Sequence, residues 1–204
     1  GTTTDNWLSM ENRFKFSKRL AAERISMKYA AKIMVSTKQE MDEQYAHPLY
    51  ISALDQFDKS KFEIIPPGVN ENIFSQTPAL TDKKLKQKLD AIFGTKGGPV
   101  ILVSSRLDEK KYIIGVVQAY LEDNALIEKA QLVLCFRGIN DPAADIHKLS
   151  KEEQIVLRKI LNIIERGHIQ KHVHFLNIGS QPELAATYRY FAQRGSVFAL
   201  TSLY

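Results

Sequence analysis

The sequence predicts an α/β fold built around a parallel β-sheet. From residue 99 onward, short apolar runs alternate with longer amphipathic segments, which is the order that parallel strands joined by right-handed helical crossovers produce. Residues 100–103 form an unbroken run of β-formers, typical of a strand buried on both faces. The expected elements are strand 99–103, helix 111–123, strand 131–136, helix 150–166, strand 172–176, helix 181–193 and strand 196–200.

Residues 11–31 predict an amphipathic helix, because their apolar side chains recur at helical spacing. The apolar stripe consists of Phe16, Leu20, Met27 and Ala31. A basic cluster that includes Lys18 and Arg19 lies on a different face. Such a cluster is ordinarily a solvated flank of a helix, so the spacing alone assigns it no ligand.

Two short strands are expected next, at residues 31–35 and 62–65. Between them, Thr37 and Glu40 form a capping-box pattern, which predicts a helix that continues to about residue 45. The sequence of residues 45–60 is typical of an irregular loop.

The segment after the second strand predicts a domain boundary near residue 70. Pro66 and Pro67 stiffen the chain, and Gly68 permits a positive φ, which suits a fixed crossing between two domains. A plain surface turn would have the same composition. The following residues are polar and rich in lysine, with a helix expected at 82–93. The expected domains are residues 1–69 and residues 70–204.

The loop after strand 99–103 carries two cations at the edge where open α/β sheets bind ligands. Arg106 and Lys111 lie on this loop and the first turn of the next helix, where backbone N–H groups and the helix dipole favour an anion. Arginine offers a planar fork to phosphate oxygens and lysine a mobile point charge, so the pair suits a diphosphate. The alternative is that both are solvated loop charges. Arg137 follows strand 131–136 at the same edge of the sheet, where it either faces a substrate or caps its loop.

Composition limits the classes of function. The chain has 204 residues, 44% of them hydrophobic and 25% charged, which is typical of a globular protein. Its net charge of +5 fits phosphorylated metabolites, but it is too diffuse to indicate nucleic acid. No apolar run approaches the roughly 20 residues that cross a bilayer, so we expect no membrane partner and a cytoplasmic location. Neither a Gly-x-Gly-x-x-Gly nor a P-loop pattern is present.

Cysteine and histidine usage gives no sign of redox or metal chemistry. The single cysteine, Cys135, lies inside an apolar run, which indicates a buried packing residue rather than a nucleophile. His47 precedes a proline and has no second His, Cys or carboxylate at metal-ligand spacing. We therefore expect no metal site.

Four segments resemble, in the same order, motifs of the sucrose-phosphate synthase family, most closely its bacterial members. Val35–Glu40 resembles the Ser-Thr-x-Gln-Glu segment, and Ile65–Asn70 resembles the Ile-Pro-Pro-Gly hinge segment. Ser105–Lys111 resembles Ser-Arg-Leu/Pro-Asp-x-Lys-Lys-Asn, and Gly195–Ser202 resembles a late strand of the family. Tyr112 departs from the pattern, because the family usually has Asn or Gly there.

The resemblance implies a retaining glycosyltransferase of the GT-B type, which has two Rossmann-like domains. Residues 1–69 would be the end of the amino-terminal, acceptor-side domain with its hinge, and residues 70–204 part of the carboxy-terminal, nucleotide-sugar-binding domain. The chain would thus be a central fragment of a longer enzyme. That enzyme would transfer glucose from UDP-glucose to fructose 6-phosphate, without a cofactor or metal, to give sucrose 6-phosphate.

The resemblance also implies site residues. Arg106 and Lys111 would be catalytic, because they would neutralise the leaving UDP. The other donor-binding candidates are Gly68, Arg137, Asn177, Ile178 and Leu184. The acceptor-phosphate candidates are Lys18 and Arg19, with Arg13 as a rival.

Other functions remain open at this point. One alternative is a related glycosyltransferase with another donor or acceptor, with ADP in place of UDP as the donor nucleotide. An alternative from another class is a non-catalytic module that binds a nucleotide or a sugar phosphate. We expect negligible transferase activity from these 204 residues alone.

Overall fold

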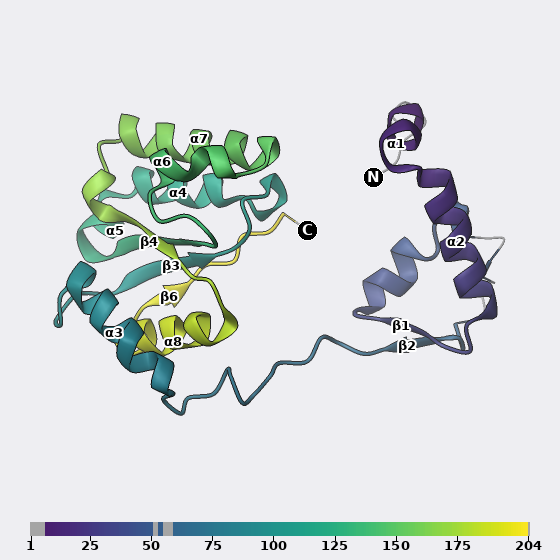
Figure 1. Ribbon diagram of the computed structural model, residues 1–204, viewed down its shortest axis with the longest axis horizontal. Helices are drawn as coiled ribbons and strands as arrows, with labels where there is room; N and C mark the ends of the chain where they lie inside the picture. Colours follow the sequence, from purple (N-terminus) through teal and green to yellow (C-terminus); the bar gives the residue numbers. More distant parts are fainter. Residues whose placement is uncertain (1–6, 51–52, 55–58, 204) are drawn as a thin grey trace. The chain divides into compact units, whose positions relative to one another are not determined.

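The computed structural model describes residues 7–50, 53–54 and 59–203. The chain forms two compact units, residues 1–69 and residues 70–204 (Figure 1). The expected loop at 45–60 lies partly outside the described residues, and its described part contains a short 3₁₀ turn, η2 (Pro48–Tyr50).

The first unit combines two helices with a small parallel sheet. Its helices are α1 (Trp7–Phe14) and α2 (Phe16–Tyr29). Strands β1 (Ile33–Val35) and β2 (Phe62–Ile64) pair in parallel, with Ile33 opposite Phe62. Met27 from α2 packs with Ile33, Val35 and Leu54 in a small buried cluster.

The expectation of one continuous helix over residues 11–31 was wrong. Lys15 has a left-handed backbone with φ of 52°, so the helix breaks there into α1 and α2. The carboxylate of Glu11 accepts hydrogen bonds from the backbone N–H and the hydroxyl of Ser17, at 2.7 and 2.6 Å. The apolar stripe of Phe16, Leu20, Met27 and Ala31 begins after Lys15, so its spacing did not test the continuity of residues 11–15.

The helix expected after Thr37 is short. Thr37 Oγ1 accepts a hydrogen bond from the Glu40 N–H at 3.1 Å, as its capping pattern predicted. The Glu40 carboxylate instead accepts from the Ser36 N–H at 2.8 Å. The turn continues as a π-helix, η1 (Glu40–Gln44).

The second unit has one parallel sheet covered by helices on both faces. Its strands are β3 (Val100–Ser104), β4 (Gln131–Phe136), β5 (Val173–Asn177) and β6 (Val197–Phe198). They lie in the order β5-β4-β3-β6, and every pair is parallel. The predicted α/β class is confirmed. The helices and helical turns are α3 (Leu80–Phe93), η3 (Glu109–Lys111), α4 (Ile113–Glu122), α5 (Asn124–Lys129), α6 (Pro142–Asp145), η4 (Ile146–Lys148), α7 (Lys151–Arg166), η5 (Gln170–His172) and α8 (Gln181–Ala192).

Helices cover both faces of the sheet (Figure 1). Alternate residues of the buried strands face opposite helical layers. In β4, Leu132, Leu134 and Phe136 pack with α4, α5 and α7, whereas Val133 and Cys135 pack with α3 and α8. Both sides are apolar, which is why the strand sequence is continuously hydrophobic.

The strand order creates a switch point at the ligand edge. The chain runs outward from β3 to β4 and β5, and then returns to pair β6 with the other side of β3. The connection after β3 leads to β4 on one side, whereas β6 lies on the other side of β3. In open parallel sheets, ligands bind beside the carboxyl ends of strands at such a point.

An ion pair joins α3 to α8 below this sheet. Arg189 donates to both carboxylate oxygens of Asp82, each at 2.7 Å. Its remaining nitrogen donates to the carbonyls of Ile73 and Ser75, at 3.2 and 3.0 Å. Arg189 thus fixes the segment that precedes α3. Its hydrogen bonds are the largest cause that lowers the pKa of Asp82.

Candidate functional site

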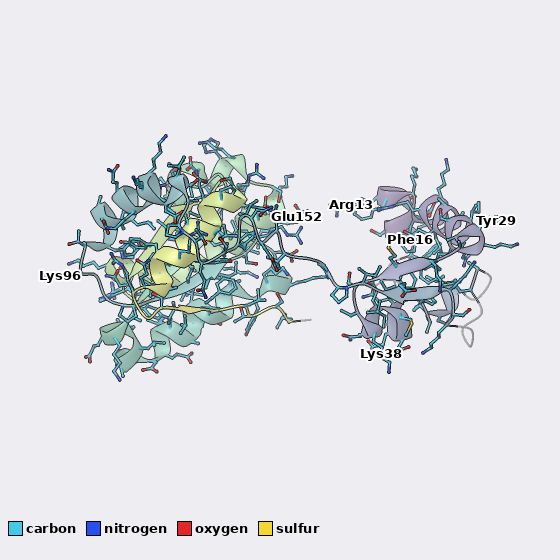
Figure 2. The ribbon with its side chains drawn as sticks, turned by 90° about the horizontal axis from the view of Figure 1, so that it is seen from below. Arg13, Phe16, Tyr29, Lys38, Lys96 and Glu152 are labelled. Carbon is cyan, nitrogen blue, oxygen red and sulfur yellow. The ribbon has the colours of Figure 1, made fainter. Side chains whose placement is uncertain are left out.

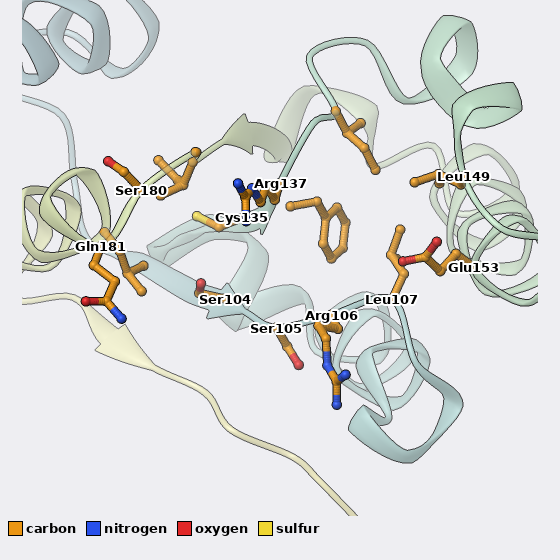
Figure 3. Close-up of a pocket in the computed structure, with 15 residues that line it drawn as sticks. Ser104, Ser105, Arg106, Leu107, Cys135, Arg137, Leu149, Glu153, Ser180 and Gln181 are labelled. Carbon is orange, nitrogen blue, oxygen red and sulfur yellow. The ribbon is translucent and has the colours of Figure 1, made fainter. Parts of the chain in front are cut away.

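A cavity of about 370 Å³ lies at the carboxyl ends of β3, β4 and β5 (Figure 3). The β3 end contributes Ser105 and Arg106, and the β4 end contributes Phe136 and Arg137. The β5 side contributes Ile178 and, from the first turns of α8, Leu184. Four of the predicted donor-binding residues therefore line one cavity: Arg106, Arg137, Ile178 and Leu184.

Strand register brings the two arginines to the same edge. Ser104 of β3 pairs with Cys135 of β4, and Arg106 and Arg137 each follow two residues later. Both are exposed, and among the described residues neither guanidinium has a hydrogen-bond or ion-pair partner. Two cations that form no ion pair among the described residues suit an anionic ligand, although the Glu153 carboxylate also lines the cavity.

Lys111 lies at the switch point rather than in the lining of this cavity. Its Nζ donates to the hydroxyl of Ser202 at 3.2 Å. In return, Thr201 Oγ1 donates to the Lys111 carbonyl at 3.0 Å, and the Leu203 N–H donates to the Lys110 carbonyl at 2.9 Å. The segment after β6 thus holds the loop after β3, and it fixes where the Lys111 ammonium lies.

The loop that carries both cations has a defined local structure. Asp108 Oδ1 accepts a hydrogen bond from the Lys110 N–H at 3.0 Å and thereby caps the 3₁₀ turn η3. Tyr112 links η3 to α4 with a left-handed backbone, φ 50° and ψ 35°. Asn and Gly adopt this conformation most readily, so the departure at Tyr112 lies at a strained position.

Asn177 belongs to the same edge but does not line the cavity. Its Oδ1 accepts a hydrogen bond from the Gly138 N–H at 2.8 Å, and its Nδ2 donates to Asn140 Oδ1 at 3.1 Å. We expected the Asn177 side chain beside the nucleotide base, but its amide forms hydrogen bonds with the loop after β4 instead.

The remaining predicted site residues lie in the first unit. Lys18 and Arg19 are exposed on α2, and among the described residues their side chains have no hydrogen-bond or ion-pair partner. Arg13, the rival, lies over the ring of Phe14 at 4.9 Å (labelled in Figure 2). Gly68 is exposed and does not use the positive φ that its type permits. The structure leaves the acceptor-phosphate assignment a prediction.

Sequence reasoning missed part of the cavity wall. Ile139 and Leu149 come from the connection between β4 and α7, and Glu153 comes from the first turn of α7. Ser150 and Glu153 form a reciprocal capping box, with hydrogen bonds of 3.3 and 3.0 Å. That Ser-x-x-Glu spacing was the available signal for where the wall turns into helix.

Cys135 reaches the cavity as a protonated thiol. Burial raises the pKa of its thiol to about 12, so it is not a nucleophile at neutral pH. No group of three or more potential metal ligands occurs among the described residues. In that part of the chain, no helix has the length and apolar character to span a bilayer.

Curated proteins similar to this chain include sucrose-phosphate synthases. The chain is 38% identical over 194 residues to a probable sucrose-phosphate synthase of Thermosipho melanesiensis, covering 95% of this chain and 39% of that relative. It is 26% identical to probable sucrose-phosphate synthase 2 of Arabidopsis thaliana, covering 93% of the chain and 20% of the relative. For sucrose synthase 2 of Tulipa gesneriana the values are 28%, 97% and 27%. No protein-family model matches the chain.

Solved structures give the same class of fold. The sucrose-phosphate synthase of Thermosynechococcus elongatus aligns with a TM-score of 0.56 and 22% identity, covering 85% of this chain and 36% of that one. HepE of Anabaena, solved in complex with UDP and glucose, aligns with a TM-score of 0.53 and 17% identity, covering 86% and 41%.

The fold defines the class of protein: the chain has the fold of GT-B glycosyltransferases. Within that class it is a relative of the sucrose-phosphate synthases, as its four sequence motifs predicted. It spans 39% of the length of the Thermosipho relative.

Proposed function

We propose that the protein to which this chain belongs is a retaining glucosyltransferase. It transfers glucose from UDP-glucose to fructose 6-phosphate and gives sucrose 6-phosphate. Residues 1–69 are the end of the acceptor-side domain with its hinge at Gly68, and residues 70–204 are part of the donor-binding domain. A cytoplasmic location is part of the same proposal.

The observation that carries the proposal is the pair of arginines at the edge cavity, Arg106 and Arg137, which have no protein partner in the described part of the chain. When the bond between glucose and the β-phosphate breaks, negative charge develops on the departing UDP. Donors already placed where this charge appears lower the barrier most. Arg106 and Lys111, on one loop beside the switch point, are suited to this task, and Arg137 adds a third cation. In this proposal the cations neutralise UDP without a metal ion.

The donor assignment has support from a neighbour and from the cavity itself. HepE, with the same fold, was solved with UDP and glucose. In the present chain, Ile178 and Leu184 offer apolar surface for a base on the side of the cavity opposite the loop after β3. We assign the phosphates to the cationic side and the uracil to the apolar side.

Calorimetric titration of UDP into the protein tests the donor site. Arg106→Ala and Lys111→Ala are each expected to weaken binding by about 1.5–3 kcal/mol, or roughly ten- to 150-fold, the range for charge-assisted hydrogen bonds. Arg158→Ala and Lys129→Ala are matched controls, because both residues are exposed cations elsewhere in the same unit. Equal binding by all five proteins would remove the donor-site assignment.

The acceptor assignment needs its own experiment. The exposed cations Lys18 and Arg19 would bind the 6-phosphate of the acceptor, so the double variant Lys18→Ala/Arg19→Ala should raise the KM for fructose 6-phosphate in the complete enzyme. The KM for UDP-glucose should stay unchanged. An equal rise in both values would show that the cluster does not recognise the acceptor.

A second candidate is a nucleotide-binding module without catalysis. The chain spans 39% of the length of its Thermosipho relative and contains the edge cavity with its arginines. The 204 residues alone are therefore expected to bind UDP without turning over UDP-glucose and fructose 6-phosphate. Turnover above background by this chain would refute that expectation.

A further inference from the structure

The connection between β4 and α7 builds one wall of the edge cavity. It contributes Arg137, Ile139 and Leu149 to the lining. Ile139 is 1% exposed and anchors the connection in the core, whereas Arg137 is exposed. Between them, Gly138 has a left-handed backbone with φ of 80°, so the chain turns sharply next to Arg137. What holds this turn therefore also sets the direction of Arg137.

One side chain from the neighbouring strand holds both sides of the turn. Asn177 is the last residue of β5, and its register partner is Phe136, the residue before Arg137. Its carbonyl oxygen accepts from the Gly138 N–H at 2.8 Å, and its amide nitrogen donates to Asn140 Oδ1 at 3.1 Å. An asparagine can do this because its amide carries an acceptor and two donors.

The same network continues into the rest of the connection. Asp145 is 8% exposed, and its Oδ2 accepts hydrogen bonds from the N–H groups of Asn140 and Asp141, at 2.8 and 3.1 Å. Lys148 Nζ donates to Oδ1 of the same carboxylate at 2.6 Å. The connection is thus ordered along its length before any ligand arrives.

We propose that Asn177 is a positioning residue for the nucleotide site: it orients Arg137 towards the phosphates of a nucleoside diphosphate and does not touch the ligand itself. This inference rests on the donor site proposed above. A cation that is already ordered loses less conformational freedom on binding, so fixing the turn raises affinity without adding a contact to the ligand.

A double-mutant cycle separates this role from a merely structural one. UDP is titrated into wild type, Asn177→Ala, Arg137→Ala and the double variant. Asn177→Ala is expected to weaken binding about three- to tenfold, the range for one neutral hydrogen bond. If Asn177 acts through Arg137, its substitution has almost no further effect once Arg137 is alanine. An undiminished effect in the Arg137→Ala background would overturn the proposal.

Two further variants guard the interpretation. Asn140→Ala removes only the outer hydrogen bond of Asn177 and should show a smaller loss with the same dependence on Arg137, which keeps the test available if Asn177→Ala does not fold. Asn162→Ala, an exposed asparagine on α7, is the matched control and should bind UDP as wild type does.

The outcomes distinguish this inference from the proposed function. If Arg106→Ala weakens UDP binding but Arg137→Ala does not, the nucleotide site stands and the role of Asn177 falls. The role also falls if Arg137→Ala weakens binding while Asn177→Ala and Asn140→Ala do not. If neither arginine affects UDP binding, both proposals are rejected together.

Discussion

Replacing Arg189 by methionine is expected to destabilise the second unit strongly. Methionine keeps most of the aliphatic stem but removes the guanidinium, which donates four hydrogen bonds within 3.2 Å. The side chains of Arg189 and Asp82 are 12% and 21% exposed, so water replaces these bonds poorly. The variant leaves the Asp82 carboxylate with two backbone donors, the N–H of Ala79 at 3.2 Å and its own N–H.

The expected loss of stability depends on how exposed the Arg189–Asp82 ion pair is, and its exposure lies between that of a surface pair and that of a buried pair. Hydrogen bonds to charged groups contribute about 1.5–3 kcal/mol, and breaking a buried pair costs about 3–5 kcal/mol. Because the Arg189–Asp82 pair is partly exposed, we expect a loss of about 2–3 kcal/mol in the free energy of unfolding at pH 7. Arg158→Met, an exposed arginine on α7, should cost less than about 0.5 kcal/mol.

Urea unfolding followed by tryptophan fluorescence and by circular dichroism measures the stability of the two units separately. The only tryptophan of the chain, Trp7, is in the first unit, so its fluorescence reports on that unit. Far-UV circular dichroism is dominated by the second unit, which has most of the helices. Arg189→Met should shift the circular dichroism transition to lower urea and leave the fluorescence transition in place. A loss below about 0.5 kcal/mol, or no coupling in a cycle with Asp82→Asn, would refute the reasoning.

The pH dependence gives an independent check on the same pair. Arg189 lowers the pKa of Asp82 below its unfolded value of about 3.9, so the carboxylate stabilises the fold above that pH. The stabilisation is lost as the pH falls through the lowered pKa. The stability difference between wild type and Arg189→Met should therefore narrow below about pH 4.

Three further predictions concern the ligand edge. The pKa of Asp145 is lowered to about 2, first by the hydrogen bond from Lys148 and then by the N–H groups of Asn140 and Asp141. The ionised carboxylate therefore stabilises the fold fully above about pH 4, and this stabilisation is lost towards pH 2. In Asp145→Asn, the melting temperature of the second unit should depend less on pH between about pH 4 and pH 2, and an unchanged dependence would contradict this. Ser202→Ala removes the hydroxyl bound to Lys111 and should weaken UDP binding about three- to tenfold in the wild-type background. In the Lys111→Ala background it should have no further effect. Calorimetry measures both effects, with Ser9→Ala as the control. A Cβ at Gly115 would overlap the ring of Tyr112, so Gly115→Ala should lower the thermal stability of the wild-type protein. In the Tyr112→Asn background, the same substitution should raise stability by up to about 1 kcal/mol, because Ala favours a helix over Gly by that amount. A change of the same sign in both backgrounds would show that the Tyr112 ring does not exclude a side chain at residue 115.

Local patterns predicted the second unit well because its information is local. The run 131–136 is strand β4 with both bounds as expected, and its double burial explains the unbroken apolar sequence. Ser150 begins α7 through a side-chain cap that the sequence displays directly. Short elements escaped this reasoning: α5 and α6 have six and four residues, too few for a periodic pattern.

The first unit was predicted less well, for a physical reason. Its break at Lys15 depends on a left-handed residue whose type gives no warning, since lysine normally avoids that conformation. The Glu11 side chain that bonds to Ser17 lies six residues away, a separation that no helix-cap pattern uses. The break therefore follows from an interaction between two helices, and periodicity describes only one helix at a time.

The position of Lys111 shows why the candidate site was only partly predictable. The sequence marks Lys111 as a cation at a strand end, but its ammonium is placed by Ser202, 91 residues later. That contact exists because β6 returns to the free side of β3, which the alternation of strands and helices does not specify. The loop after β3 contains Lys111, and the strand order brings Ser202 close enough to accept its hydrogen bond. In the proposed donor site, residues 201–203 therefore help to position the phosphate-binding loop, although none of them carries a charge.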